Sequence, residues 1–214
     1  MDNEQLERQL IEGNAPQVLG QLFLNYQERL SKIVHFRMDG RLRSRIDVAD
    51  VLQEAFLEAT QRVQDYRDCS NEISFFLWLR FIVLQKLTQL HRHHLGVQAR
   101  DANRDVPIFA RATTQATSVV LAAQLLGKIT SPSGAAIREE NKRNLEAALG
   151  QMESIDREVL ALRHFEHLSN SETARLLELS ESAACNRYFR AVRRLKTIME
   201  QIHGPSGIFS RTND

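Results

Sequence analysis

The stretch from Leu168 to Leu195, LSNSETARLLELSESAACNRYFRAVRRL, constrains the fold of this chain more than any other. Ser169 or Asn170 can cap a short helix, and the run Glu178–Ser180 interrupts the pattern before a second helix. Apolar residues of the second helix recur at i, i+4, i+7 and i+11, namely Ala184, Tyr188, Ala191 and Leu195. This spacing predicts a helix-turn-helix.

The opposite face of the second helix is basic. Between Asn186 and Lys196 there are five cations and no acid. Such a helix suits insertion into a DNA major groove, whereas the alternative is a solvated basic face on an ordinary bundle helix. Helical geometry turns these side chains outward: Ser182, Cys185, Asn186, Phe189, Arg190 and Arg193. A thiol at Cys185 could sense redox state, but a small residue that permits close approach to DNA is the simpler interpretation.

Charge is unevenly distributed along the 214 residues, although the formal net charge is only +1. The segment Asp47–Asp68 carries six acids and two cations, in contrast to the basic second helix. A protein with segregated charge can meet different partners on different faces. A short basic connector, Arg41–Arg45, precedes the acidic segment.

Several classes of protein are excluded by simple features. Two cysteines, Cys69 and Cys185, do not make a disulfide framework and fit a reducing, cytoplasmic location. The acidic N-terminus is not a signal peptide, and no apolar run approaches the roughly 20 residues of a membrane span. Nucleotide-binding and nucleophile motifs are absent, so we expect neither an enzyme nor a cofactor.

The periodicity predicts an all-α protein with two small helical domains joined by a long linker. In the N-terminal part, helices are expected at Asn3–Glu12, from Pro16 to about Met38, at Asp47–Tyr66 and at Ile73–His94, with a polar loop at Arg67–Glu72. The predicted domains are an N-terminal helical bundle at 1–98, a linker at 99–137, a helix-turn-helix domain at 138–203 and a disordered tail at 204–214. The linker is expected to hold one short helix, near Ser118–Leu126. Its Thr113–Ser118 segment is compatible with phosphorylation or with a plain tether.

Two blocks together resemble a known family. Asp47–Phe56, DVADVLQEAF, is similar to the D-x-x-D-L-x-Q-E-x-F run in the second conserved region of bacterial sigma factors. Phe76–Leu79 looks like the F-x-x-W-L opening of the adjoining promoter-melting region, and Met152–Leu195 looks like region four. The order and spacing resemble the extracytoplasmic-function (ECF) type of the sigma-70 family. Glu178 replaces the usual turn glycine of region four, and Cys185 stands where a lysine is frequent.

The resemblance implies a factor that binds core RNA polymerase and directs promoter-specific transcription initiation, with the largest-subunit clamp helices, the flap, promoter DNA and an anti-sigma factor as partners. The implied core-binding residues are Asp47, Asp50, Leu52, Gln53 and Glu54. The implied contacts to the −10 element are Arg67, Asp68, Ser70, Asn71, Arg80, Lys86 and Arg92. The implied contacts to the −35 element are Ser182, Cys185, Asn186, Arg187, Arg190, Arg193 and Arg194.

Other interpretations remain open at this point. A helix-turn-helix repressor or activator, or a pure interaction adaptor, would not need the acidic Asp47–Phe56 helix for polymerase docking. Trp78 is assigned to core packing rather than to base stacking. The histidines His91, His93 and His94 could suggest zinc with Cys69, but their spacing favours a solvated basic helix end.

Overall fold

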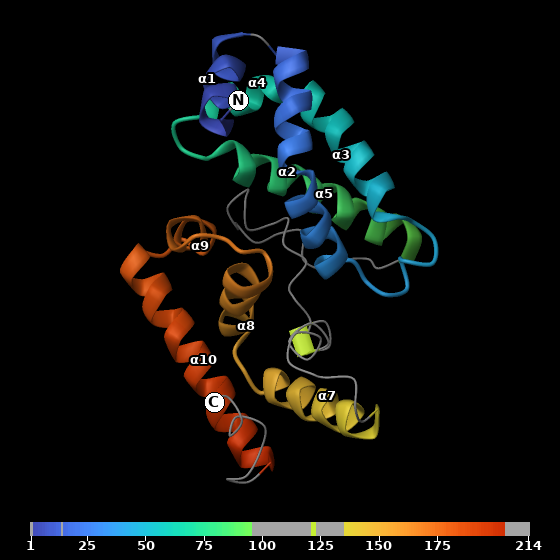
Figure 1. Cartoon of the computed structure of the whole chain (residues 1–214), viewed down its shortest axis with the longest axis vertical. Helices are drawn as coiled ribbons and strands as arrows, with labels where there is room; N and C mark the ends of the chain where they lie inside the picture. Colours follow the sequence, from blue (N-terminus) through green and yellow to red (C-terminus); the bar gives the residue numbers. More distant parts are fainter. Residues whose placement is uncertain (1, 14, 96–120, 123–134, 204–214) are drawn as a thin grey trace. The chain divides into compact units, whose positions relative to one another are not determined.

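The computed structural model describes residues 2–13, 15–95, 121–122 and 135–203, and all their regular secondary structure is helical (Figure 1). The predicted all-α class is therefore confirmed. The residues fall into two compact units, one within Met1–Thr114 and one within Gln115–Asp214. No helix in the described part of the chain is long and apolar enough to cross a membrane.

Five helices make the N-terminal unit: α1 (Asn3–Glu12), α2 (Ala15–Arg37), α3 (Val48–Gln61), α4 (Val63–Cys69) and α5 (Phe75–Leu95). Helix α1 packs on α2, while α2 and α3 pack on each other and on α5. Helix α5 is apolar around most of its circumference, which is the pattern of a central, buried helix.

An aromatic cluster lies where α4 meets the start of α5. The rings of Tyr66 and Phe75 have centroids 5.2 Å apart, and Tyr66 and Trp78 lie 5.3 Å apart. Such ring pairs add about 0.5–1.5 kcal/mol beyond the burial of their area. Trp78 is only 2% exposed, so its assignment to packing is confirmed.

The predicted helix Asp47–Tyr66 is in fact two helices, because the chain turns at Arg62. The backbone of Arg62 has φ −108° and ψ 14°, outside the helical region. Its side chain binds Asp65 in α4 (Nε to Oδ2, 2.9 Å) and Gln85 in α5 (Nη1 to Oε1, 2.9 Å). The polar loop is consequently shorter than expected, since Arg67 and Asp68 lie within α4.

The C-terminal unit consists of α7 (Ala135–Gly150), α8 (Ser154–Leu160), a π-helix (Ala161–Phe165), α9 (Asn170–Leu176) and α10 (Glu181–His203). Helix α10 packs against α7, α8 and α9. The π-helix widens the helical turn at the end of α8, with the Glu166 N–H donating to the Ala161 carbonyl at 3.1 Å. The side chains Leu145, Ala148, Leu149 and Met152 are buried in this unit.

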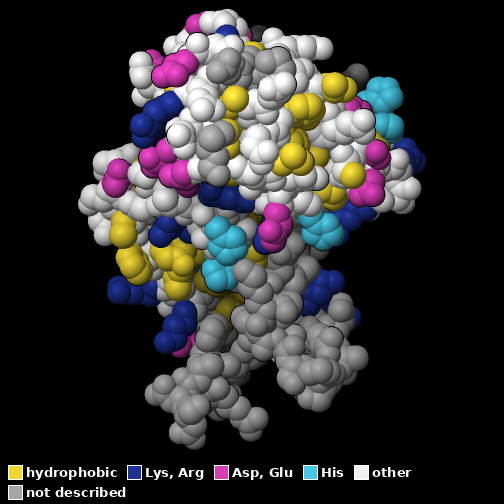
Figure 2. Space-filling view, turned by 45° about the horizontal axis from the view of Figure 1, so that its top comes forward, with side chains coloured by type: hydrophobic (Ala, Val, Ile, Leu, Met, Phe, Trp, Pro, Cys, Tyr) yellow, Lys and Arg dark blue, Asp and Glu magenta, His cyan; other side chains and the backbone are white. Residues whose placement is uncertain are grey.

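Most of the predicted linker and all of the predicted tail lie outside the described residues. Helix α7 begins at Ala135, two residues before the expected end of the linker. Leu121 and Ala122, from the short helix expected near Ser118–Leu126, are helical and buried. Figure 2 shows hydrophobic side chains in separate groups among charged and polar ones on the visible face.

Candidate functional site

A reciprocal capping arrangement begins the helix-turn-helix. The Ser169 hydroxyl accepts from the Glu172 N–H (3.1 Å), and the Glu172 carboxylate accepts from the Ser169 N–H (2.7 Å). This capping box satisfies two backbone donors that the start of α9 would otherwise leave open. Of the two caps that the sequence allowed, the structure uses Ser169.

The turn between α9 and α10 depends on a left-handed residue. Glu178 has φ 55°, a conformation that costs an L-residue roughly 1–2 kcal/mol and that glycine adopts freely. The Ser180 hydroxyl then accepts from the Ala183 N–H (3.1 Å) at the start of α10. The Asn170 amide donates to the Glu181 carbonyl (2.8 Å), which holds the beginnings of α9 and α10 together.

Helix α10 separates a buried side from an exposed side. Ala184 and Ala191 are buried, while Tyr188 and Leu195 are half-buried, so the predicted inward stripe is present. The exposed side chains of the helix include Ser182, Asn186, Phe189, Arg190, Val192 and Arg193. Phe189 is 62% exposed, although its neighbour two positions along the chain, Ala191, is fully buried. Its outward position follows from the helical period, yet Phe189 was not among the predicted contact residues.

Two arginines of α10 bind carboxylates of α8 and of the residue that precedes it. Arg187 Nη1 lies 3.0 Å from Asp156 Oδ1, and Arg194 Nη1 lies 3.1 Å from Asp156 Oδ2. Arg194 also binds Glu153 (Nη1 to Oε1, 3.2 Å), and this contact raises the pKa of Arg194. The Asp156 side chain is 7% exposed, so the shared carboxylate is shielded from water, whereas the Arg194 and Glu153 side chains are exposed. Arg187 and Arg194 therefore help to hold α10 against α8.

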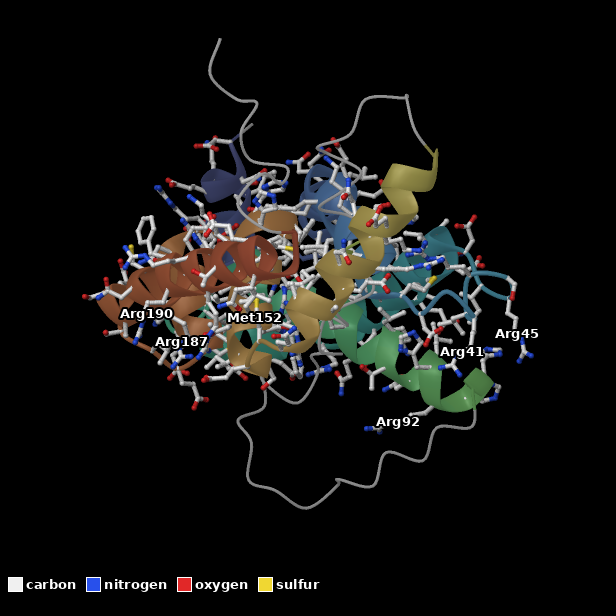
Figure 3. The ribbon with its side chains drawn as sticks, turned by 90° about the horizontal axis from the view of Figure 1, so that it is seen from below. Arg41, Arg45, Arg92, Met152, Arg187 and Arg190 are labelled. Carbon is white, nitrogen blue, oxygen red and sulfur yellow. The ribbon has the colours of Figure 1, made fainter. Side chains whose placement is uncertain are left out.

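The other two basic side chains near the start of α10 are placed differently. Arg190 and Arg193 are exposed, and Arg190 makes a long contact to the Asn186 carbonyl within its own helix (3.4 Å). Figure 3 shows Arg187 and Arg190 at the same end of α10. Cys185 is half-buried and free. The structure thus leaves Asn186, Arg190 and Arg193 available to a ligand.

An exposed polar surface runs along α3. Asp47 caps the helix with a capping box in which the Asp47 N–H donates to Asp50 Oδ2 (3.1 Å). Gln53 and Glu54 are exposed on the following turn. Leu52 is 4% exposed and belongs to the core. Leu57 is 56% exposed on the same helix, an apolar side chain that the sequence analysis did not single out.

The predicted contact between Arg80 and DNA is wrong, because the Arg80 side chain is buried. Arg80 is 1% exposed and lies inside the bundle, not on an outer face of α5. The physical reason is helical geometry. Arg80, Lys86 and Arg92 are spaced by six residues, and each step turns the side chain by about 240° at 100° per residue. These three residues therefore cannot share one face.

The remaining predicted −10 contacts are dispersed. Lys86 faces α3, where it binds Glu58 (Nζ to Oε2, 3.0 Å) and lowers the pKa of that carboxyl. The Arg67 Nε donates to the Leu10 carbonyl (3.0 Å) and ties α4 to α1. Asp68, Asn71 and Arg92 are exposed, and Ser70 is half-buried. Among the described residues, no group of three or more His, Cys, Asp or Glu side chains could hold a metal ion.

The C-terminal geometry defines a DNA-binding protein of the helix-turn-helix class. Residues 142–195 match the family described as sigma-70, region 4. The chain is 28% identical over 171 residues to the RNA polymerase sigma-H factor of Pseudomonas aeruginosa, covering 79% of this chain and 80% of that protein. A solved structure of CnrH in complex with the cytosolic domain of CnrY shares the fold, with a TM-score of 0.50 and 23% identity over 93% of this chain and 97% of that one.

Residues 142–195 therefore match sigma-70 region 4, and the chain is similar in sequence to an RNA polymerase sigma factor and in fold to CnrH.

Proposed function

We propose that the N-terminal unit docks on core RNA polymerase and contacts the −10 element, while the C-terminal unit reads the −35 element of a promoter. The observation that carries this proposal is the geometry of α10, a capped recognition helix that exposes Asn186, Arg190 and Arg193 at its start and middle. Residues at the start of such a helix reach base edges, and cations further along meet phosphates.

Docking on the polymerase is assigned to the outer face of α3, with the clamp helices of the largest subunit as its partner. The flap is a further proposed partner of the chain and is not assigned to this helix. Asp50, Gln53 and Glu54 are exposed there, and no cation lies between Asp47 and Gln61. The exposed Leu57 supplies an apolar contact beside these polar groups. For contact with the −10 element, the accessible candidate residues are Asp68, Asn71 and Arg92.

The test is a pull-down of purified core polymerase by the full chain. Gln53→Lys with Glu54→Lys reverses the surface while leaving the Asp47–Asp50 capping box intact, and we expect binding to fall at least tenfold. The matched control is Glu4→Lys with Gln5→Lys, an adjacent exposed Glu and Gln pair on α1. Equal core binding by both double variants would refute docking through α3.

We also propose that an anti-sigma factor binds the chain in the cytoplasm and holds it inactive. The support is the fold shared with CnrH, whose solved structure contains the cytosolic domain of CnrY. Genome-wide mapping of polymerase after overexpression, with and without a co-expressed candidate partner, tests this proposal. Unchanged promoter occupancy in the presence of a partner that binds the chain would contradict it.

A further inference from the structure

The basic connector at residues 40–46 is an ordered turn. Leu42 is fully buried between the exposed Arg41 and Arg43 and so anchors the segment in the core. Backbone hydrogen bonds tighten the turn, from the Leu42 N–H to the Asp39 carbonyl (2.9 Å) and from the Arg45 N–H to the Leu42 carbonyl (2.9 Å). The buried anchor forces the neighbouring arginines toward solvent.

Two contacts join this turn to the end of α5, about fifty residues later in the sequence. The Asp39 N–H donates to His91 Nε2 (3.2 Å), and Arg45 Nη1 donates to the His94 carbonyl (3.0 Å). The second bond also places a cation at the negative end of the α5 dipole. Figure 3 shows Arg41, Arg45 and Arg92 at one end of the N-terminal unit.

The resulting surface, which we call the connector surface, is strongly basic. Its exposed members are Arg41, Arg43, Arg45, Arg92 and His93. Residues 40–46 contain three arginines and no acid. Asp39 is the acid beside them, and it is bound by Arg41 (Nη2 to Oδ2, 2.9 Å). None of these arginines lies on α3, the helix that we assign to polymerase docking.

We infer that the connector surface binds the phosphate backbone of duplex DNA without reading its sequence. Arginines set by a rigid turn lose less conformational entropy on contacting phosphates than free side chains do, and they match phosphate oxygens with several donors. Proteins that bind single strands add exposed aromatic rings for base stacking, but Phe36, the aromatic residue nearest to the turn in the sequence, is 2% exposed. A surface with cations and no exposed Phe, Tyr or Trp suits a duplex backbone.

The inference deepens the proposed function, and its test needs no polymerase, so a failure of docking through α3 does not affect it. The full chain is titrated with a fluorescent 30-base-pair duplex of scrambled sequence at a series of salt concentrations. Each phosphate contact contributes about 0.9 to the slope of log K against log salt. Arg41→Gln with Arg43→Gln should reduce the slope by up to about 1.8.

The matched control is Arg8→Gln with Lys32→Gln, which removes two exposed cations from α1 and α2 and should leave the slope unchanged. Arg41→Lys with Arg43→Lys keeps the charge and should restore most of the slope. Ser44→Lys adds an exposed cation to the turn and should increase the slope by up to about 0.9, even if the double Gln variant folds poorly. Equal slopes for the connector and control variants, or no response to Ser44→Lys, would overturn the inference.

Discussion

Arg187 and Asp156 are 31 positions apart in the sequence, yet Arg187 Nη1 lies 3.0 Å from Asp156 Oδ1. The pair joins the recognition helix to α8. Because the Asp156 side chain is 7% exposed and the Arg187 side chain 26%, water screens the pair only partly. The position of α10 relative to α8 therefore depends on one carboxylate that accepts from two arginines.

Asp156→Asn should lower the free energy of unfolding of the C-terminal unit by about 1–3 kcal/mol, since it removes the charge that both arginines bind. Circular dichroism during thermal unfolding measures the change. The single tryptophan, Trp78, lies in the N-terminal unit, so its fluorescence transition should stay where it is. The control is Glu153→Gln, whose side chain is 62% exposed and whose loss should have little effect. Similar destabilisation by both variants would show that the buried carboxylate has no special role.

Glu178→Gly should stabilise the C-terminal unit by about 0.5–1 kcal/mol, because glycine adopts the left-handed conformation without strain. Part of the gain is offset by the greater freedom of glycine in the unfolded chain. Glu181→Gly, in the first position of α10, should instead destabilise the unit. A melting temperature that falls for Glu178→Gly would contradict the account of the turn.

The stability of the N-terminal unit should depend on the titration of His91. Burial lowers the pKa of His91 below its ordinary value of 6.5. The unfolded chain therefore binds a proton at His91 more readily than the folded chain does. The contribution of neutral His91 to stability is fully present above about pH 6.5 and is lost as the pH falls toward the lowered pKa. Hydrogen bonds from Arg41 lower the pKa of Asp39 to about 2, which removes Asp39 from this window.

His91→Gln keeps an acceptor for the Asp39 N–H but does not titrate. We expect it to flatten the stability profile between about pH 5 and 7, measured by Trp78 fluorescence during denaturation. His93→Gln, at an exposed position, is the control and should keep the wild-type profile. If the His91 and His93 variants gave the same profile, burial of His91 would not be the cause.

Asn186→Ala should weaken binding to a preferred promoter by about 1–3 kcal/mol while changing binding to a scrambled duplex little, if the amide contacts a base. Arg193→Ala should weaken both duplexes alike and reduce the salt slope by about 0.9. Binding of the full chain to both duplexes across a salt series separates the two. Equal losses on both duplexes for Asn186→Ala would exclude base readout by that residue.

Local sequence signals predicted most of the helices. The bounds of α1 and the inward positions of Ala184 and Ala191 follow from spacing alone, whereas capping preferences narrowed the start of α9 to Ser169 or Asn170. The break at Arg62 did not, because its side chain bridges to Gln85, a contact that sequence spacing does not reveal. The pairing of Arg187 with Asp156 is long-range for the same reason.

The misplacement of Arg80 has a different origin. The helical period alone excludes a shared face for Arg80, Lys86 and Arg92, since a six-residue step does not return a side chain to the same direction. Arg80, Lys86 and Arg92 share a charge but leave the helix in three different directions, so charge alone did not define a common surface. The assignments of residues to polymerase and to promoter elements stay predictions, and Arg187 and Arg194 now carry a structural role beside them.

The carboxylates of Asp156 and Glu153 bind two arginines of α10 in the way that DNA phosphates would. A duplex that approaches the recognition helix must compete with Asp156 and Glu153 for two of its arginines, so fewer condensed counterions are released than the basic sequence of the helix suggests. The penalty falls on every DNA sequence equally, whereas contacts through Asn186 do not share it. In a genome with millions of competing sites, masking of these arginines weakens binding to non-specific DNA. More of the protein is then free to search for its promoters.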